Sequence, residues 1–262
     1  MNLEPRRTVL AIALPVLLAV LFVAAPGDLE EKLHQALRGI CAQRPDHSFI
    51  VGGRPMALEA RMHGIFAGFS TAVALAWLQG RWRRSELPRG SILAFLAAGI
   101  ALMGVDGLNA LLYDLGGPHL YVPRNDLRLI TGLLCGIGAA GFAAPVISFV
   151  FWQERDPRPL FATRGELLWG IVGVGLVGGL VFIPQPAGVL LSAVGAVAVV
   201  GAITLVNAYI WVLCWEGPGR AERWNDLTWA WMAGLLLAVG ELAGLGVLRD
   251  WLEATFRLSW VI

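Results

Sequence analysis

The sequence predicts an all-α integral membrane protein, namely a polytopic bundle of about seven transmembrane spans with a cytoplasmic N-terminus. Three observations predict this class. The 262-residue chain is 57% hydrophobic and only 15% charged, which is too apolar for an ordinary soluble domain. Apolar runs of membrane-spanning length recur along it. Arginine dominates the cations, and its placement alternates between the loops as it does in membrane proteins.

The apolar runs define the predicted spans. A hydrocarbon core of about 30 Å requires roughly 20 apolar residues per helix. Seven runs meet this requirement to within a few residues: 8–25, 61–80, 91–111, 129–152, 167–183, 187–215 and 227–248. The first run resembles a signal peptide, but its length and Pro26, just after the only small-residue cleavage site, favour a retained helix. The Pro184–Pro186 break predicts a tight hairpin between the fifth and sixth spans.

The arginines set the predicted orientation. They fall before the first span and in every second loop thereafter: Arg6, Arg7, Arg81, Arg83, Arg84, Arg89, Arg155, Arg158, Arg164, Arg220 and Arg223. The positive-inside rule makes this side cytoplasmic. Most tryptophans lie near the same ends, where amphipathic rings favour the interface. We therefore expect a multi-pass protein of the prokaryotic inner (cytoplasmic) membrane. Its expected partners are membrane lipids or other membrane subunits, and no basic block suggests nucleic acid.

A short amphipathic helix is expected between the first two spans, on the extracytoplasmic side. Asp28 can cap it, with Glu31 three residues later in capping-box spacing. Leu29, Leu33, Leu37 and Ile40 form one stripe, so this helix is expected to lie along the outer membrane surface. The chain is predicted to form a single integral membrane domain, 1–262. Residues 36–150 carry its polar site, and 151–262 form a glycine-rich helical scaffold whose small residues allow close helix packing.

Polar residues gather at the predicted outer ends of the spans. Intramembrane ionisable groups are expensive to bury, so they are functional candidates. Glu59 and His63 are four residues apart and share a helix face, as do Asp106 and Asn109 at a spacing of three. We predict Glu59, His63 and Asp106 as catalytic or proton-transferring residues. The predicted ligand-binding residues are Cys41, Gln43, His47, Arg61, Asn109, Asn125, Asp126 and Arg128.

These residues support several functional hypotheses. The first is binding, with or without processing, of an amphipathic ligand with an anionic head group of the lipid or polyprenyl phosphate type, held by Arg61 and Arg128. The second is a metal-dependent membrane hydrolase in which Glu59 and His63, together with Cys41 or Asp106, hold a divalent ion such as zinc. The third is a non-catalytic subunit or assembly factor. A fourth, a transporter, lacks the duplicated broken-helix pattern. A simpler interpretation is a hydrogen-bond network in which Arg61 or Arg128 neutralises Glu59 or Asp106.

Two sequence blocks resemble those of a known family. The run from Ile40 to Phe49 resembles a C-H-Q-x-P-x-R-S-F signature, with matches at Cys41, Gln43, Pro45, Ser48 and Phe49. The run 59–68 is similar to C-A-R-C-x-G-I-Y-x-G, with matches at Ala60, Arg61, Gly64, Ile65 and Gly68. A third similarity covers Asp106–Gly107 and Asn125–Gly132.

The family that carries these blocks comprises predicted bacterial and archaeal membrane proteins catalogued as a domain of unknown function. The resemblance spans about residues 36–150 and implies a membrane protein with a site at its outer face, without implying an activity. Glu59 and Met62 stand where the family often has cysteines, Ala42 replaces a histidine and His47 replaces an arginine. A cysteine-rich centre would therefore be lost here or rebuilt with Glu59 and His63.

Overall fold

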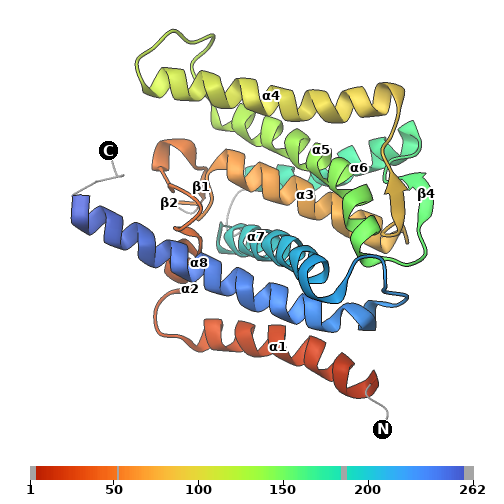
Figure 1. Ribbon diagram of the computed structural model, residues 1–262. Helices are drawn as coiled ribbons and strands as arrows, with labels where there is room; N and C mark the ends of the chain where they lie inside the picture. Colours follow the sequence, from red (N-terminus) through yellow and green to blue (C-terminus); the bar gives the residue numbers. More distant parts are fainter. Residues whose placement is uncertain (1–3, 52, 184–187, 257–262) are drawn as a thin grey trace.

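Long helices account for most of the chain. The computed structural model describes residues 4–51, 53–183 and 188–256, which form a bundle of roughly aligned helices (Figure 1). The helices are α1 (Glu4–Ala24), α2 (Leu29–Leu37), α3 (Ala60–Leu78), α4 (Gly90–Asp114), α5 (Asn125–Phe151), α6 (Arg164–Gly179), α7 (Gly188–Trp211) and α8 (Thr228–Phe256). Short turns are η1 (Pro45–His47), η2 (Leu180–Phe182), η3 (Val212–Glu216) and η4 (Trp224–Leu227). The proline-rich break expected to form a hairpin lies outside the described residues.

The all-helical membrane bundle that the sequence predicts is confirmed. Among the described residues, five helices are long and apolar enough to cross a membrane: α4, α5, α6 with η2, α7 with η3, and η4 with α8. Ile12–Ala24 of α1 and α2 pass the same test together, but the chain bends by 118° between them. Helix α3 is not among the five, because it carries Arg61 and His63 and is rich in small residues. The number of seven spans therefore stays a prediction.

Helix α3 occupies the middle of the bundle. It packs against α5, α6 and α7, while α4 and α1 lie at opposite edges (Figure 1). The contact between α3 and α5 depends on glycines from both helices. A Cβ atom built on Gly64 would lie 2.5 Å from the carbonyl oxygen of Leu129. One built on Gly136 would lie 2.5 Å from both the oxygen of Ile65 and the nitrogen of Phe69. The two backbones therefore touch directly, as small residues allow in membrane helices.

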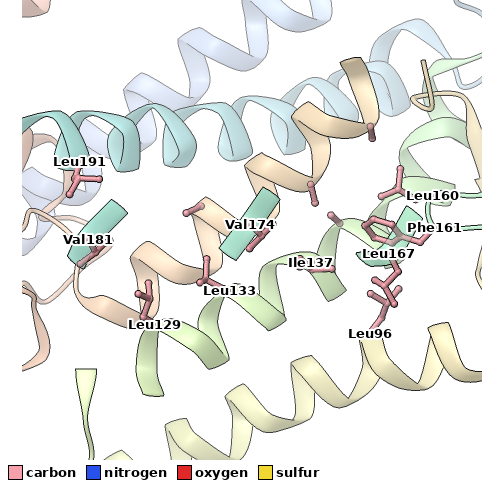
Figure 2. Packing of buried hydrophobic residues seen from close by; sticks show 14 of the residues in the cluster. Leu96, Leu129, Leu133, Ile137, Leu160, Phe161, Leu167, Val174, Val181 and Leu191 are labelled. Atoms are coloured by element: carbon pink, nitrogen blue, oxygen red, sulfur yellow. The ribbon is translucent and has the colours of Figure 1, made fainter. Parts of the chain in front are cut away.

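An apolar core surrounds this contact. Figure 2 shows Leu129, Leu133 and Ile137 of α5 facing the core, together with Val174 of α6 and Leu96 of α4. All five are buried, and Leu96, Leu129 and Ile137 are each 1% exposed. Burial of such side chains stabilises the bundle wherever the unfolded chain would meet water. The core positions the N-terminal end of α3 beside that of α5, where the polar residues lie.

The loops of the bundle gather at two ends. At one end, β3 (Arg84–Glu86) pairs in parallel with β4 (Asp156–Pro159), and Trp152 forms a bridge with Ala221. The arginine-bearing segments around residues 84, 156 and 221 thus lie together, as the predicted cytoplasmic side requires. At the other end, β1 (Ile50–Val51) pairs antiparallel with β2 (Arg54–Pro55) in the loop between α2 and α3 (Figure 1).

Helix α2 forms where the sequence predicts it, but its environment differs from the expectation. The Asp28 carboxylate caps it by accepting the N–H of Glu30 at 3.4 Å, rather than that of Glu31. Leu33 and Leu37 are buried in a cluster that includes residues of α7 and α8, so most of the leucine stripe faces the bundle and not the membrane surface. Helix α8 also extends past its predicted end at 248, because its last turns pair with α2: Arg38 forms an ion pair with Asp250 at 2.5 Å.

Candidate functional site

The loop from Cys41 to Glu59 closes on itself beside α2. Cys41 is 4% exposed, and its Sγ atom accepts the backbone N–H of Glu59 at 3.3 Å. Burial raises the pKa of the Cys41 thiol, although the N–H of Glu59 acts in the opposite direction. Gln43 adopts a positive φ of 60°, which turns the chain sharply. Its side-chain amide donates to the carbonyls of His34 at 2.8 Å and Ala57 at 3.0 Å, so Cys41 and Gln43 mainly hold the loop in shape.

A group of acidic residues surrounds His47 in this loop. The Nε2 atom of His47 lies 3.4 Å from Asp46 Oδ2 and 3.6 Å from Asp114 Oδ2, and Nδ1 lies 3.7 Å from Glu59 Oε2. Arg44 pairs with Asp46 at 2.8 Å and with Asp114 at 2.9 Å. Together these contacts tie the loop to the C-terminal end of α4.

The Glu59 carboxylate is the most buried of these acids outside the helices. It accepts the backbone N–H of Arg44 at 3.0 Å. Burial by itself raises the pKa of Glu59, but the nearby His47 imidazole, the N–H and the charge of Arg44 outweigh it, so the net pKa is lowered. Glu59 is therefore a charged acceptor that anchors the loop.

Arg128 lies beneath the turn from Asp46 to Ser48. Its guanidinium donates hydrogen bonds to Asn125 Oδ1 at 2.8 Å and to the carbonyl of Asp46 at 3.4 Å. Asn125 in turn donates its amide to the carbonyls of Asp46 and Ser48, so the loop covers the start of α5. Arg128 is 4% exposed, its Nε has no hydrogen-bond partner, and it forms no ion pair with any residue that the structure describes. A buried guanidinium that contacts only neutral oxygens is the unusual feature of this end.

A second arginine is neutralised within the bundle. Arg61 of α3 pairs with Asp106 of α4 at 2.6 Å, and Asp106 is 1% exposed. The other carboxylate oxygen of Asp106, Oδ1, accepts the hydroxyl of Tyr121 at 2.7 Å, while the hydroxyl of Thr131 lies 3.4 Å from Oδ2, the oxygen that pairs with Arg61. Burial and the hydrogen bond to Asp106 raise the pKa of Tyr121. The Nε of Arg61 is buried and has no partner among the described residues, as is also true of Arg128.

The remaining predicted site residues are Asn109, Asp126 and His63, and each has a different environment. Asn109 holds the loop between α4 and α5: its oxygen accepts the N–H of Leu120 at 2.7 Å, and its amide donates to Tyr121 at 3.0 Å. Asp126 pairs with the exposed Arg124 at 2.5 Å. His63 is 1% exposed, and both of its ring nitrogens lack hydrogen-bond partners in the described structure. It lies against Gly195 of α7, where a Cβ atom would come within 3.2 Å of Nδ1.

The proposed metal ligands do not form a metal site in this geometry. In the described ranges, no group of three or more histidine, cysteine, aspartate or glutamate side chains is arranged to hold a metal ion. Cys41 and Glu59 are engaged within the loop, whereas His63 faces α7. Residue spacing places Glu59 and His63 on one helix face, but Glu59 precedes the helix and its carboxylate turns back to the loop.

Two residues that contact the predicted site, Asp114 and Tyr121, are not among the residues predicted to bind a ligand or to react. Asp114 accepts Arg44 from the end of α4, and Tyr121 donates to Asp106. Asp114 lies two helical turns after Asp106, so helical spacing could have placed both on a similar face. Tyr121 lies in an irregular loop, and no sequence pattern indicates its contact.

Comparisons with known proteins cover the segment that carries this site. Residues 41–142 match the family described as "Predicted membrane protein (DUF2085)". The chain is also 26% identical over 115 residues to an "Uncharacterized protein MJ1492" of Methanocaldococcus jannaschii, an alignment that covers 44% of this chain and 68% of that protein. No solved structure matches the chain. The resemblance to an uncharacterised family of predicted membrane proteins is thus confirmed over residues 41–142.

Proposed function

We propose that the protein binds a membrane amphiphile with an anionic head group at the outer end of the bundle, and that Arg128 is the principal cation. The observation that carries this proposal is the burial of Arg128 to 4% exposure with only carbonyl and amide oxygens as partners. A buried charge without a directly paired counter-ion is destabilising, and an incoming phosphate or carboxylate would relieve this penalty. The planar guanidinium also matches both anions in a bidentate geometry.

The neighbouring residues support a binding role more than a catalytic one. Arg61 contributes a second guanidinium, but Asp106 already neutralises it and fixes its position. Asp106 itself accepts from Arg61 on one carboxylate oxygen and from Tyr121 on the other, so we assign it a positioning role. The predicted roles of Glu59 and His63 in proton transfer stay untested predictions. The hydrolase and the non-catalytic-subunit hypotheses are also untested.

The loop above Arg128 provides a route for the ligand. The turn from Asp46 to Ser48 is held over Arg128 by neutral hydrogen bonds from Asn125, and the direct contact with Arg128 is long, at 3.4 Å. The ion pairs of Arg44 with Asp46 and Asp114 are partly exposed to solvent, and such pairs contribute little stability. A head-group oxygen would replace the Asp46 carbonyl when this turn moves outward.

The test compares two arginine variants at the same end of the bundle. Arg128→Gln removes the proposed cation, while Arg124→Gln makes the same charge change at an exposed residue paired with Asp126. The probe is dihexanoyl phosphatidic acid, with dihexanoyl phosphatidylcholine as the zwitterionic control, and binding is followed by native mass spectrometry. Loss of charged hydrogen bonds should weaken phosphatidic acid binding by about 10- to 100-fold in Arg128→Gln. Arg124→Gln should bind as the wild type does.

Arg128→Lys adds a graded measurement, because it keeps the charge and loses the planar fork. We expect intermediate affinity for this variant. Equal binding of phosphatidic acid by the wild type and Arg128→Gln would overturn the proposal, as would equal affinity of the wild type for the anionic and zwitterionic probes.

A further inference from the structure

A large cavity lies in the other half of the bundle, away from Arg61 and Arg128. It has a volume of about 710 Å³ and lies between α3, α5 and α7. This volume is within the roughly 300–1,000 Å³ of pockets that hold small ligands. The cavity is partly open, and its walls are almost entirely apolar, with Val73, Ile147 and Val197 as representative side chains. The hydroxyl of Ser70, which also lines it, is already donated to the carbonyl of Ala198 at 3.2 Å.

The length of the cavity matches one leaflet of a bilayer. Its lining follows α3 from Ala67 to Trp77, which corresponds to about 15 Å at a rise of 1.5 Å per residue. This is half of a hydrocarbon core of about 30 Å. Protein interiors are close-packed, and an empty space of this size would leave its apolar walls without contacts. A single extended hydrocarbon chain fits both the shape and the chemistry.

The end of the cavity at Arg81 and Trp82, its mouth, carries the groups that a lipid head would need. Trp82 lines this end, and its buried indole Nε1 has no hydrogen-bond partner among the described residues. Arg81 lies beside it and shares the carboxylate of Glu166 with Arg84: the distances are 3.3 Å from Arg81 and 2.8 Å from Arg84. Arg84 also lies 3.9 Å from Asp156, which pairs with Arg158 at 2.7 Å, so the three guanidinium groups outnumber the two carboxylates by one. A tryptophan cluster, with Trp82 and Trp224 at 5.5 Å between ring centroids, places this mouth at an interface.

We propose that this cavity is a specific site for one acyl chain of an anionic phospholipid from the predicted cytoplasmic leaflet. An ester or phosphate oxygen of the lipid accepts the N–H of Trp82, and the head group lies near Arg81. This inference goes beyond the proposed function, because it concerns different residues at the opposite end of the bundle. Arg128→Gln is expected to leave this site unchanged, so the two proposals can fail independently.

Two glycines provide a matched pair of variants. Gly201 of α7 lines the cavity, and Gly240 of α8 lies on the exposed surface of the bundle; no described atom lies within 4 Å of a Cβ atom built on either. Leucine is a better helix former than glycine, so neither substitution should reduce thermal stability. Gly201→Leu projects a side chain into the cavity, whereas Gly240→Leu does not. Trp82→Phe removes the N–H and keeps an aromatic ring.

The experiment uses the full chain in nanodiscs that contain phosphatidylglycerol with a photoactivatable diazirine in one acyl chain. Cross-linked peptides are identified by mass spectrometry. We expect cross-links on residues 67–77 and 194–205, competed by unlabelled phosphatidylglycerol more strongly than by phosphatidylcholine. Gly201→Leu displaces about two methylenes, which should lower cross-linking about tenfold. Trp82→Phe should lower it about two- to tenfold. Gly240→Leu should have no effect.

Three outcomes would overturn the proposal. Cross-links spread evenly over all lipid-facing helices in the wild type would indicate surface lipid only. Unchanged cross-linking in a Gly201→Leu protein with wild-type thermal stability would show that the chain does not enter the cavity. Competition by a polyprenyl phosphate but not by phosphatidylglycerol would assign the cavity to an isoprenoid chain. If Gly201→Leu lowers the unfolding temperature, the wild-type cross-linking map and Trp82→Phe decide the question.

Discussion

The direct backbone contact between α3 and α5 makes a strong prediction about Gly136→Ala. The added methyl group would lie 2.5 Å from backbone atoms of Ile65 and Phe69, about 0.9 Å inside the 3.4 Å at which ordinary contact begins. Backbone cannot rotate away as a flexible side chain can, so the helices must separate. Overpacking of this kind is destabilising by about 1–3 kcal/mol or more, against a gain of about 1 kcal/mol from replacing a helical glycine by alanine. The difference is a net loss of about 0–2 kcal/mol, and we expect a value near the upper end because both close contacts are with backbone atoms.

Gly104→Ala provides the matched control. Gly104 lies within α4, and no described atom comes within 4 Å of its added Cβ. Only the helix-forming gain remains there, so stability should rise by up to about 1 kcal/mol. Unfolding by SDS in mixed dodecyl maltoside micelles, followed by circular dichroism, would measure both variants. The reasoning is refuted if Gly136→Ala is as stable as Gly104→Ala.

Three other predictions concern Asp106, Cys41 and Glu59 at the outer end of the bundle, with Cys214 of the opposite end as a comparison. Asp106→Asn should destabilise the protein by about 1–3 kcal/mol, because it leaves the partly buried guanidinium of Arg61, which is 24% exposed, without its counter-ion, and adding Arg61→Met should recover part of the loss in the unfolding temperature. The exposed Cys214 should react with N-ethylmaleimide at pH 8 much faster than Cys41, because burial raises the pKa of Cys41 and lowers its thiolate fraction; comparable labelling of both peptides would contradict this. Glu59 has a pKa below its ordinary value of 4.5, so its contribution to stability is complete above that pH and is lost as the pH falls through the lowered value. Unfolding temperatures measured from about pH 6 to about pH 3 should therefore fall less in Glu59→Gln than in the wild type.

The sequence predicts the helices well because hydropathy is a local property. Each predicted apolar run coincides with a helix, and the arginine-bearing segments around residues 84, 156 and 221 meet at one end. The central position of α3 could not be predicted in the same way. Its glycines at 64 and 68 indicate close packing with some helix, but only the assembled bundle shows that the partner is α5.

The candidate site was predictable as a group of residues but not as a geometry. The simpler interpretation, in which Arg61 is neutralised by Asp106, agrees with the observed ion pair. The proposed ligand set of Cys41, Glu59 and His63 does not form a metal-binding group among the described residues, because Cys41 and Glu59 are engaged in the loop before α3 while His63 lies against Gly195 of α7. The cavity had no sequence signal at all, since it arises where α7 stands apart from α5 and not from any residue pattern.

The start of the matched family segment is held in place by Arg249, near the end of α8. Its guanidinium donates to the carbonyls of Arg38 and Cys41, both at 2.8 Å, and to that of Ala42 at 3.3 Å. The family match begins at residue 41, so the first residues of that segment are fastened by a side chain more than two hundred positions later. The boundary drawn by sequence similarity is therefore not a boundary of folding. A fragment cut to residues 41–142 would lack Arg249 and therefore the hydrogen bonds that hold the carbonyls of Cys41 and Ala42 in position.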